Sequence, residues 1–338
     1  MKILRRLNGT VIWNSGDSLL LSSKDKISYS KDQGKTFDFS VRLPVIVKEK
    51  LKLQTKLGRR LFRREIRQVI EISDHFFLLL VGKSIFQMDA KSQSINLAGS
   101  LPGSASLRMA WDGENLIYGE YFGNKERTAV PVWISDNLGN SWRKIFCFHD
   151  IRHVHGVIFD PFQNCFWITT GDYGQEAAIW KMESDFTKPK EIIRGDQNCR
   201  AIDLLVFEDF LIYGTDTPLT QNKIFKIDKS GNNRIELQNV GGSVFYLERK
   251  GLQVFCTTAV EPSDFNDNAY TELWTCNLSN TSKWQRLCKF KKDFWHVQIF
   301  QFGQIKIPAG EGSRTGIWVT PFATKFDQTS LFIGMENA

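Results

Sequence analysis

Four side chains in one stretch of the chain could carry acid–base or ion-binding chemistry. They are His153, His155, Asp172 and Tyr173. Imidazole, carboxylate and phenol groups serve in enzymes as general acids, general bases and nucleophiles. They act together only on a rigid support that brings them close in space, because they are well separated in sequence.

That support is predicted to be a β-hairpin. Two apolar runs, 154–159 and 165–170, flank the turn-forming cluster 160–164, which is the pattern of an antiparallel hairpin. Side chains alternate along a strand, so the two histidines share one face. The hairpin then brings both imidazoles beside the carboxylate and the phenol at its open end. We expect these four groups to be catalytic and to lie in a solvated pocket.

The same hairpin pattern places further charged residues at one rim of the fold. A basic or imidazole residue opens the first strand of most predicted repeats, and an acidic residue follows the second strand. These candidate substrate-binding residues are Arg67, Arg108, Glu120, Arg200, Asp216, Glu261, His296 and Glu311. A ring of convergent charges suits a polar or anionic ligand, and arginine can bind both oxygens of a carboxylate. Each Arg–acid pair could instead be a structural ion pair. The spacing assigns no metal ligands and leaves any cofactor unknown.

The elements that would position these residues are short strands separated by turns, which indicates an all-β fold. One turn signature, S-x-[DN]-x-G-x-[ST]-[WF], occurs at 30–37 and again at 135–142. Weaker copies place turn residues at positions 89, 185, 228 and 279. Four strands per repeat of about 40–50 residues is typical of a β-propeller. The alternative, a pair of β-sandwiches, would not be expected to repeat one signature so regularly.

The repeated turn resembles the Asp box, or BNR repeat, of the sialidase-like β-propellers. We therefore expect a single β-propeller domain over residues 1–338, with seven four-stranded blades, or six if the C-terminal strands complete the first blade. The resemblance also implies a glycosidase of acidic sugars, with an arginine triad that binds a carboxylate. Arg67, Arg108 and Arg200 could imitate that triad. The early Arg-Ile-Pro motif of the family is missing, since the nearest match, residues 61–65, lacks the proline.

The histidine-rich centre is also similar to that of the propeller polysaccharide lyases. In those enzymes a histidine or tyrosine base attacks a uronate that a basic group or a metal neutralises, so Tyr173 or His155 would be the base here. We therefore predict a carbohydrate-active propeller that acts on an acidic saccharide, as a glycoside hydrolase or a lyase. The alternative is a non-catalytic binding or assembly scaffold, a role that other Asp-box propellers have.

The positive charge of the chain is concentrated in one segment. Residues 48–67 hold nine Lys/Arg against two Glu, a surplus of seven positive charges that equals the net charge of +7. The rest of the chain is therefore close to neutral and does not favour nucleic-acid coating. Leu53, Leu57 and Leu61 have helical spacing, and the segment is predicted to be a basic insertion between the first and second blades. It could contact an anionic surface or a subunit, or be only a solvated helix or loop. The basic residues concerned are Lys48, Lys50, Lys52, Lys56, Arg59, Arg60, Arg63 and Arg64.

The six cysteines are scattered and have no CxxC spacing. They are expected to be free thiols in a reducing compartment, which favours the cytoplasm. No stretch approaches the roughly 18 apolar residues of a membrane span, and the N-terminus shows no signal-peptide pattern.

Overall fold

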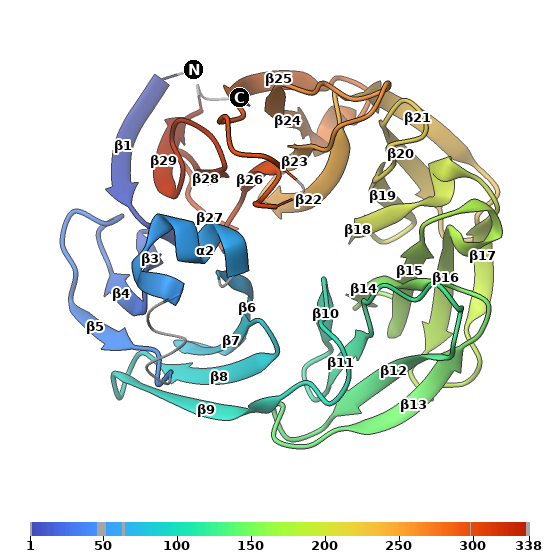
Figure 1. Ribbon diagram of the computed structural model, residues 1–338, viewed down its shortest axis with the longest axis horizontal. Coiled ribbons are helices and arrows are strands. Elements are labelled where there is room, and N and C mark those ends of the chain that lie inside the picture. Colours follow the sequence, from blue (N-terminus) through green and yellow to red (C-terminus); the bar gives the residue numbers. More distant parts are fainter. Residues whose placement is uncertain (1, 46–51, 63–64, 298, 336–338) are drawn as a thin grey trace.

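The computed structural model describes residues 2–45, 52–62, 65–297 and 299–335. Their strands form β-sheets arranged as a ring around a common axis, which is the architecture of a β-propeller (Figure 1). The predicted all-β propeller fold is therefore confirmed. Among the described residues, no helix is both long enough and apolar enough to cross a membrane.

Five of the sheets in the described residues are separate blades of four or five strands. The first contains β2 (Thr10–Ser15), β3 (Ser18–Ser23), β4 (Lys26–Ser30) and β5 (Phe39–Arg42), with β27 (Ala309–Gly312) beside β2. The second contains β6 (Ile66–Ser73), β7 (Phe76–Val81), β8 (Ser84–Asp89) and β9 (Ser94–Ser100). The third contains β10 (Met109–Trp111), β11 (Leu116–Gly119), β12 (Val130–Ser135) and β13 (Arg143–Phe148). The fourth contains β14 (His153–Asp160), β15 (Cys165–Gly171), β16 (Ala178–Glu183) and β17 (Lys190–Arg194). The fifth contains β18 (Ala201–Val206), β19 (Phe210–Thr215), β20 (Lys223–Asp228) and β21 (Arg234–Asn239).

The remaining sheet in the described residues has eight strands and closes the ring. It contains β22 (Ser243–Lys250), β23 (Gln253–Val260), β24 (Tyr270–Asn277), β25 (Gln285–Lys291), β26 (Gly303–Lys306), β28 (Gly316–Phe322), β29 (Thr329–Gly334) and β1 (Lys2–Asn8). The N-terminal strand β1 pairs antiparallel with β29, so the two ends of the chain meet (Figure 1). The predicted count of seven separate blades, or six, is wrong: five blades are separate, because β23 also pairs with β26 and so joins the remaining strands into one sheet.

The core lies between neighbouring sheets. The second strand of a blade has apolar residues on both faces, as in β7 (sequence FFLLLV) and β15 (sequence CFWITTG), and every residue of β15 is buried. One apolar cluster, for example, joins Ile117 of the third blade to Phe166 of the fourth. The outermost strands instead alternate between half-buried and exposed residues, as β1 does, since only one of their faces packs on the molecule. Burial on both faces fixes the position of each blade and thus of the residues at its ends.

The repeated turn signature has the same geometry in both copies. In the first, Asp32 accepts hydrogen bonds from the Thr36 amide at 2.9 Å and 3.1 Å, and the Ser30 hydroxyl accepts from the Gly34 amide at 2.8 Å. In the second, equivalent bonds join Asn137 to Ser141 and Ser135 to Gly139, each at 2.9 Å. The two glycines have φ of +78° and +88°, a region that side chains disfavour. These bonds explain why the signature requires those residue types.

The helical parts of the described chain are short. They include α2 (Lys56–Phe62), the turn of helix at residues 52–54, and the one-turn 3₁₀ helices η1 (Gly174–Glu176), η2 (Gln197–Cys199) and η3 (Leu278–Asn280). In Figure 1, α2 lies in front of the sheets, next to β3 and β6 and across the ring from β14 and β18.

Candidate functional site

The open end of the β14–β15 hairpin holds two histidines and one carboxylate in contact. His153 pairs with Gly171 across the strands, so Asp172 follows directly beside it. The Nε2 atoms of His153 and His155 are 3.0 Å apart. Asp172 Oδ1 lies 3.2 Å from the first Nε2 and 3.1 Å from the second. The structure thus brings together three of the four residues that the sequence places at this end, while their role stays a prediction.

A β-bulge aims His155 at the cluster. The register of the hairpin shifts between Val154 and Gly156, which places His155 at the irregularity. Gly171 leaves the room that the ring needs, because a Cβ added there would collide with the His155 imidazole. The expectation of a solvated pocket is wrong for both rings: His153 and His155 are only 3% and 2% exposed.

Backbone carbonyls of the two neighbouring blades fix the tautomers of both histidines. His153 Nδ1 lies 2.9 Å from the carbonyl oxygen of Phe122, which follows β11, and His155 Nδ1 lies 2.9 Å from that of Ala201, which opens β18. A carbonyl oxygen can only accept, so each Nδ1 carries a hydrogen. In the neutral rings both Nε2 atoms therefore present lone pairs to each other and to Asp172.

Two arginines hold the carboxylate of Asp172 from either side. Arg152 Nη1 lies 2.9 Å from Oδ2, and Arg200 Nη2 lies 3.2 Å from Oδ1. Arg200 also reaches the carboxylate of Asp216, which follows β19, at 3.4 Å. We call Arg152, His153, His155, Asp172 and Arg200 the rim cluster. Arg152 was not among the residues selected from the sequence, although it directly precedes His153.

The electrostatics of the rim cluster keep Asp172 ionised. Burial alone would raise the pKa of Asp172, but its contacts with the two imidazoles and the Arg200 guanidinium hold it well below its usual range. Burial raises the pKa of Glu261 above its ordinary value, and the nearby Asp216 carboxylate acts in the same direction. The Ser243 hydroxyl donates a 2.6 Å hydrogen bond to the Glu261 carboxylate. The predicted residues Arg200, Asp216 and Glu261 thus form a network next to Asp172.

Two tyrosines flank the rim cluster. Tyr173 is 48% exposed, and its hydroxyl oxygen lies 3.3 Å from Arg152 Nη1. The Tyr121 ring packs on the His153 ring with 4.2 Å between centroids. Burial raises the pKa of Tyr121 to about 12, so its phenol is neutral near pH 7. Sequence reasoning missed Tyr121, although its place after a second strand in the third blade is the signal that selected its neighbour Glu120.

Arg108 and Arg67 do not join the rim cluster. Arg108 packs with its backbone beside Gly156 of β14, but its side chain is paired with Asp203 at 2.5 Å and lies over the Tyr246 ring. Arg67 donates a 2.6 Å hydrogen bond to the backbone carbonyl of Ser106. The idea of an arginine triad made by Arg67, Arg108 and Arg200 is therefore wrong, because two of its members have structural partners elsewhere.

Three other predicted substrate-binding residues do not place their side chains in the rim cluster. Glu120 accepts a 2.8 Å hydrogen bond from the Trp133 indole and a 3.0 Å bond from the Ser104 amide. His296 is exposed in the connection between β25 and β26, and Glu311 is exposed in β27. Their assignment to one rim assumed identical blades. The irregular connections around the eight-stranded sheet remove that equivalence.

The basic segment is only partly a solvated surface. The Arg60 side chain is completely buried: its Nη1 lies 2.8 Å from Asp293 and 3.5 Å from Asp327, and its guanidinium lies over the Trp295 ring. Arg60 cannot take part in the predicted surface contact, because burial and these carboxylates already occupy it. Lys56 is half-exposed and within 3.5 Å of Asp327. Lys48, Lys50, Arg63 and Arg64 lie outside the described residues.

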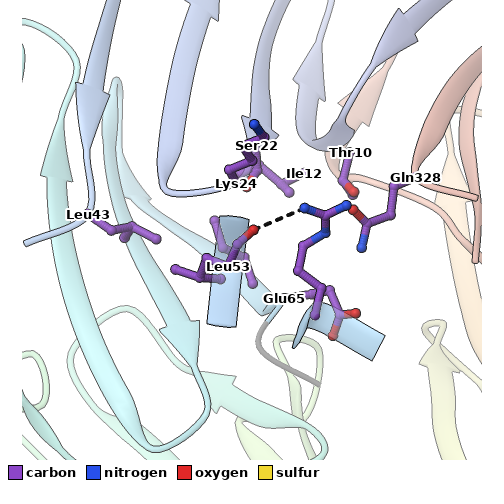
Figure 2. A pocket seen from close by; sticks show the side chains of 10 residues that line it. Thr10, Ile12, Ser22, Lys24, Leu43, Leu53, Glu65 and Gln328 are labelled. Carbon is purple, nitrogen blue, oxygen red and sulfur yellow. Dashed lines mark hydrogen bonds between the residues drawn. The ribbon is translucent and has the colours of Figure 1, made fainter. Parts of the chain in front are cut away.

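Arg59 belongs to a small pocket between this segment and the first blade. The pocket is lined by Thr10, Ile12, Ser22, Lys24, Leu43, Leu53, Arg59, Glu65, Ile66 and Gln328 (Figure 2). Arg59 Nη1 donates a 3.0 Å hydrogen bond to the Leu53 carbonyl, which is the dashed line in Figure 2. Leu53 is buried, whereas Leu57 and Leu61 are exposed. The pocket is therefore a seam where the basic segment packs on the ring, and it shares no residue with the rim cluster.

Comparisons with known proteins indicate the fold. No protein-family model matches the chain, and a search of curated proteins finds no match. Similar solved structures include a chain of the Mitotic Checkpoint Complex, with a TM-score of 0.62 and 13% identity over 99% of this chain and 95% of that chain. An ancestral GH74 enzyme has a TM-score of 0.57 and 15% identity over 97% of this chain and 44% of its own. An oligogalacturonate lyase in complex with manganese has a TM-score of 0.55 and 11% identity over 78% and 74%. At such identities the likeness shows the propeller fold alone, and the Asp-box superfamily stays a prediction.

Proposed function

We propose that the chain acts on an acidic saccharide at the rim cluster, by lyase chemistry. The observation that carries the proposal is the position of Arg152, which contacts both the buried carboxylate of Asp172 and the exposed phenol of Tyr173. This contact holds the exposed Tyr173 hydroxyl at the edge of the rim cluster, where a substrate can reach it. Tyr173 is accessible, whereas His155 is buried, with Nδ1 bonded to the Ala201 carbonyl and Nε2 facing Asp172 rather than solvent. Tyr173 is therefore the better candidate for the base.

The chemistry is a β-elimination on a uronate. The base removes the proton from C5, the C4–O bond breaks, a C4=C5 double bond forms, and the leaving oxygen takes a proton from water or a nearby acid. The uronate carboxylate must be neutralised while charge develops next to it, a role that suits the planar fork of an arginine. Arg200 is 8% exposed, and Glu261, whose pKa is raised, lies close enough to interact with it. The similarity to a lyase and a GH74 enzyme supports the substrate class only through the fold.

The experiment is product analysis after incubation with a panel of uronate- and sialate-containing oligosaccharides. Elimination leaves an unsaturated product without added water, whereas hydrolysis adds one water. Tyr173→Phe should lose turnover by about 10²–10⁴-fold, the range of general base catalysis, while saccharide binding persists. Tyr270→Phe is the matched control, because Tyr270 lies in β24, away from the rim cluster. If no saccharide in the panel binds, the proposal is wrong.

A non-catalytic role is the second candidate. Both imidazoles are closed from solvent, and a propeller that belongs to a protein assembly is among the similar structures. Saccharide binding without any product, unchanged by Tyr173→Phe, would favour a binding propeller over an enzyme. Contact of the basic segment with an anionic surface and a cytoplasmic location both stay predictions. All six cysteines are unpaired in the structure.

A further inference from the structure

We propose that His153, His155 and Asp172 form a binding site for a divalent transition-metal ion. The inference deepens the proposed function at the same site. The idea that a substrate carboxylate binds the metal rests on that function, but metal binding itself does not. The argument uses the positions of the three donor atoms, the hydrogen bonds behind them and the charges around them.

The three donor atoms form a nearly equilateral triangle. Its edges are 3.0 Å between the two Nε2 atoms, and 3.2 Å and 3.1 Å from these to Asp172 Oδ1. Metal–ligand bonds of about 2.0–2.2 Å that meet at right angles separate neighbouring ligand atoms by about 3.0 Å. The triangle therefore has the size of one face of a six-coordinate metal site.

Hydrogen bonding behind the histidines leaves their donor atoms free for a cation. Each Nδ1 donates to a backbone carbonyl, Phe122 for His153 and Ala201 for His155, both at 2.9 Å. Metal-binding histidines commonly donate their other ring nitrogen to such an acceptor, which fixes the tautomer. Both neutral rings then direct lone pairs at Asp172 Oδ1, which also carries lone pairs. Three acceptors at this separation repel one another unless a proton or a metal ion lies among them.

The surrounding charges would leave a bound metal ion able to attract an anion. The charged or titratable groups that surround the three donor residues are Arg152, Arg200, Asp216, Glu261, Tyr121 and Tyr173. The charges of the two guanidiniums balance those of Asp172 and Asp216. A bound divalent ion would therefore leave the site with a net positive charge. Three protein donors are fewer than the four to six that such ions take. A uronate carboxylate could complete the coordination.

Two imidazole nitrogens and one carboxylate oxygen are a donor set for Mn²⁺, Fe²⁺ or Zn²⁺, whereas Mg²⁺ prefers oxygen alone. Mn²⁺ is the probe of choice for the binding measurement, because it is paramagnetic and can be followed by electron paramagnetic resonance.

The test is to measure Mn²⁺ binding to the full chain, without saccharide, by calorimetry and by electron paramagnetic resonance. We expect the parent protein to bind one Mn²⁺ ion. In His153→Gln and in Asp172→Asn the Mn²⁺ affinity should be at least about 100-fold weaker. His75→Gln is the matched control, since His75 lies beside β7 and pairs with Asp74, and its Mn²⁺ binding should equal that of the parent.

A second measurement needs no variant and so does not depend on how the variants fold. Crystals of the parent protein soaked in MnCl₂ should show an anomalous-scattering peak among the three donor atoms. No Mn²⁺ binding, or a peak elsewhere only, would overturn the proposal. Metal binding without any action on saccharides would leave the metal site standing and sink the proposed function. Saccharide cleavage that chelation does not affect, together with the absence of a manganese peak, would support the proposed function and overturn the metal site.

Discussion

Two buried groups of charges on the same face of the ring differ in how they satisfy their polar atoms. One is the rim cluster. The other, the Arg60 cluster, contains Arg60, Lys292, Asp293, Trp295 and Asp327. The segment with α2 joins β5 to β6, and residues 149–152 join β13 to β14. Both are connections from the outer strand of one blade to the inner strand of the next, so they lie on one face.

The Arg60 cluster matches each anion with a cation. Both Nη atoms of Arg60 contact Asp293, Nη1 also reaches Asp327, and Lys292 Nζ lies 2.6 Å from Asp293. An aromatic ring, Trp295, covers the guanidinium. In the rim cluster, by contrast, three acceptor atoms point at one another. An unpaired Nε–H occurs in Arg60, Arg152 and Arg200, so that feature does not distinguish the two clusters within the described residues.

The difference teaches how to separate structural charges from functional ones. A buried ion pair whose members satisfy each other needs nothing further and fixes the position of a segment. A cluster whose donor atoms converge without a hydrogen among them is stable only with a proton or a ligand. Burial and charge are similar in the two clusters, so the pattern of lone pairs carries the distinction.

The largest expected effect is the loss of Arg60. Arg60→Met should reduce the free energy of unfolding by about 3–5 kcal/mol, because it removes the buried cation that the Asp293 and Asp327 carboxylates share, and Asp327 keeps only the half-exposed Lys56. Saccharide and Mn²⁺ binding by the folded fraction should not change. Chemical denaturation measures the first quantity. A loss below about 1 kcal/mol would show that the Arg60 cluster does not hold the segment to the ring.

Gly171→Ala should break the rim cluster at a smaller cost in stability. The added methyl would collide with His155, so the ring must move, which costs about 1–3 kcal/mol, and Mn²⁺ binding should be lost. Gly123→Ala is the control, since a Cβ there meets no atom within 4 Å. Unchanged Mn²⁺ affinity in Gly171→Ala would contradict the requirement for this ring position.

Lys306 sharpens the comparison, because carbonyl oxygens rather than a carboxylate hold its ammonium. It donates to the Ile66 and Arg67 backbone oxygens. Burial, with the nearby Arg108 charge, lowers the pKa of Lys306 to about 7. The unfolded chain therefore binds more protons between about pH 7 and its ordinary value of 10.5, so stability should rise with pH over that window, by at most about 1.4 kcal/mol per pH unit. The free energy of unfolding of Lys306→Met, measured by denaturation across this pH range, should not show the rise. If the rise persists in the variant, another group causes it.

The smallest effect concerns the exposed edge of the Arg60 cluster. Lys56 lies 3.5 Å from Asp327 with about half of its side chain exposed. Lys56→Gln should change the free energy of unfolding by less than about 1 kcal/mol, because solvent screens the pair. A loss of stability as large as that of Arg60→Met, measured in the same denaturation series, would contradict this. It would mean that the half-exposed Lys56 pair stabilises the fold as much as the buried Arg60 pairs do.

The sequence predicted the parts of the fold that depend on local patterns. The apolar runs on either side of residues 160–164 were enough for the β14–β15 hairpin and for the meeting of His153 with Asp172. The repeated turn was enough for a propeller. The blade count failed because the pairing of β23 with β26 joins strands that local spacing treats as separate units.

The candidate site was harder to predict than the fold, because contacts between blades decide it. Arg108 has the same sequence position in its blade as Arg200 has in the fifth, yet Asp203 captures it. Arg152 and Tyr121 join the site through neighbours that are distant in sequence. The burial of both imidazoles could not be inferred, since the carbonyls that cover them belong to other blades.

The most direct test of the central claim is the protonation of the two imidazoles, read by ¹⁵N NMR of histidine-labelled protein. The chain has five histidines. With Zn²⁺, which is diamagnetic, we predict that the Nε2 resonances of His153 and His155 move to the metal-bound range. Both Nδ1 atoms should stay protonated, and the other three rings should be unaffected. If both rings instead keep a hydrogen on Nε2 and no resonance moves, the rim cluster is a structural network like the Arg60 cluster.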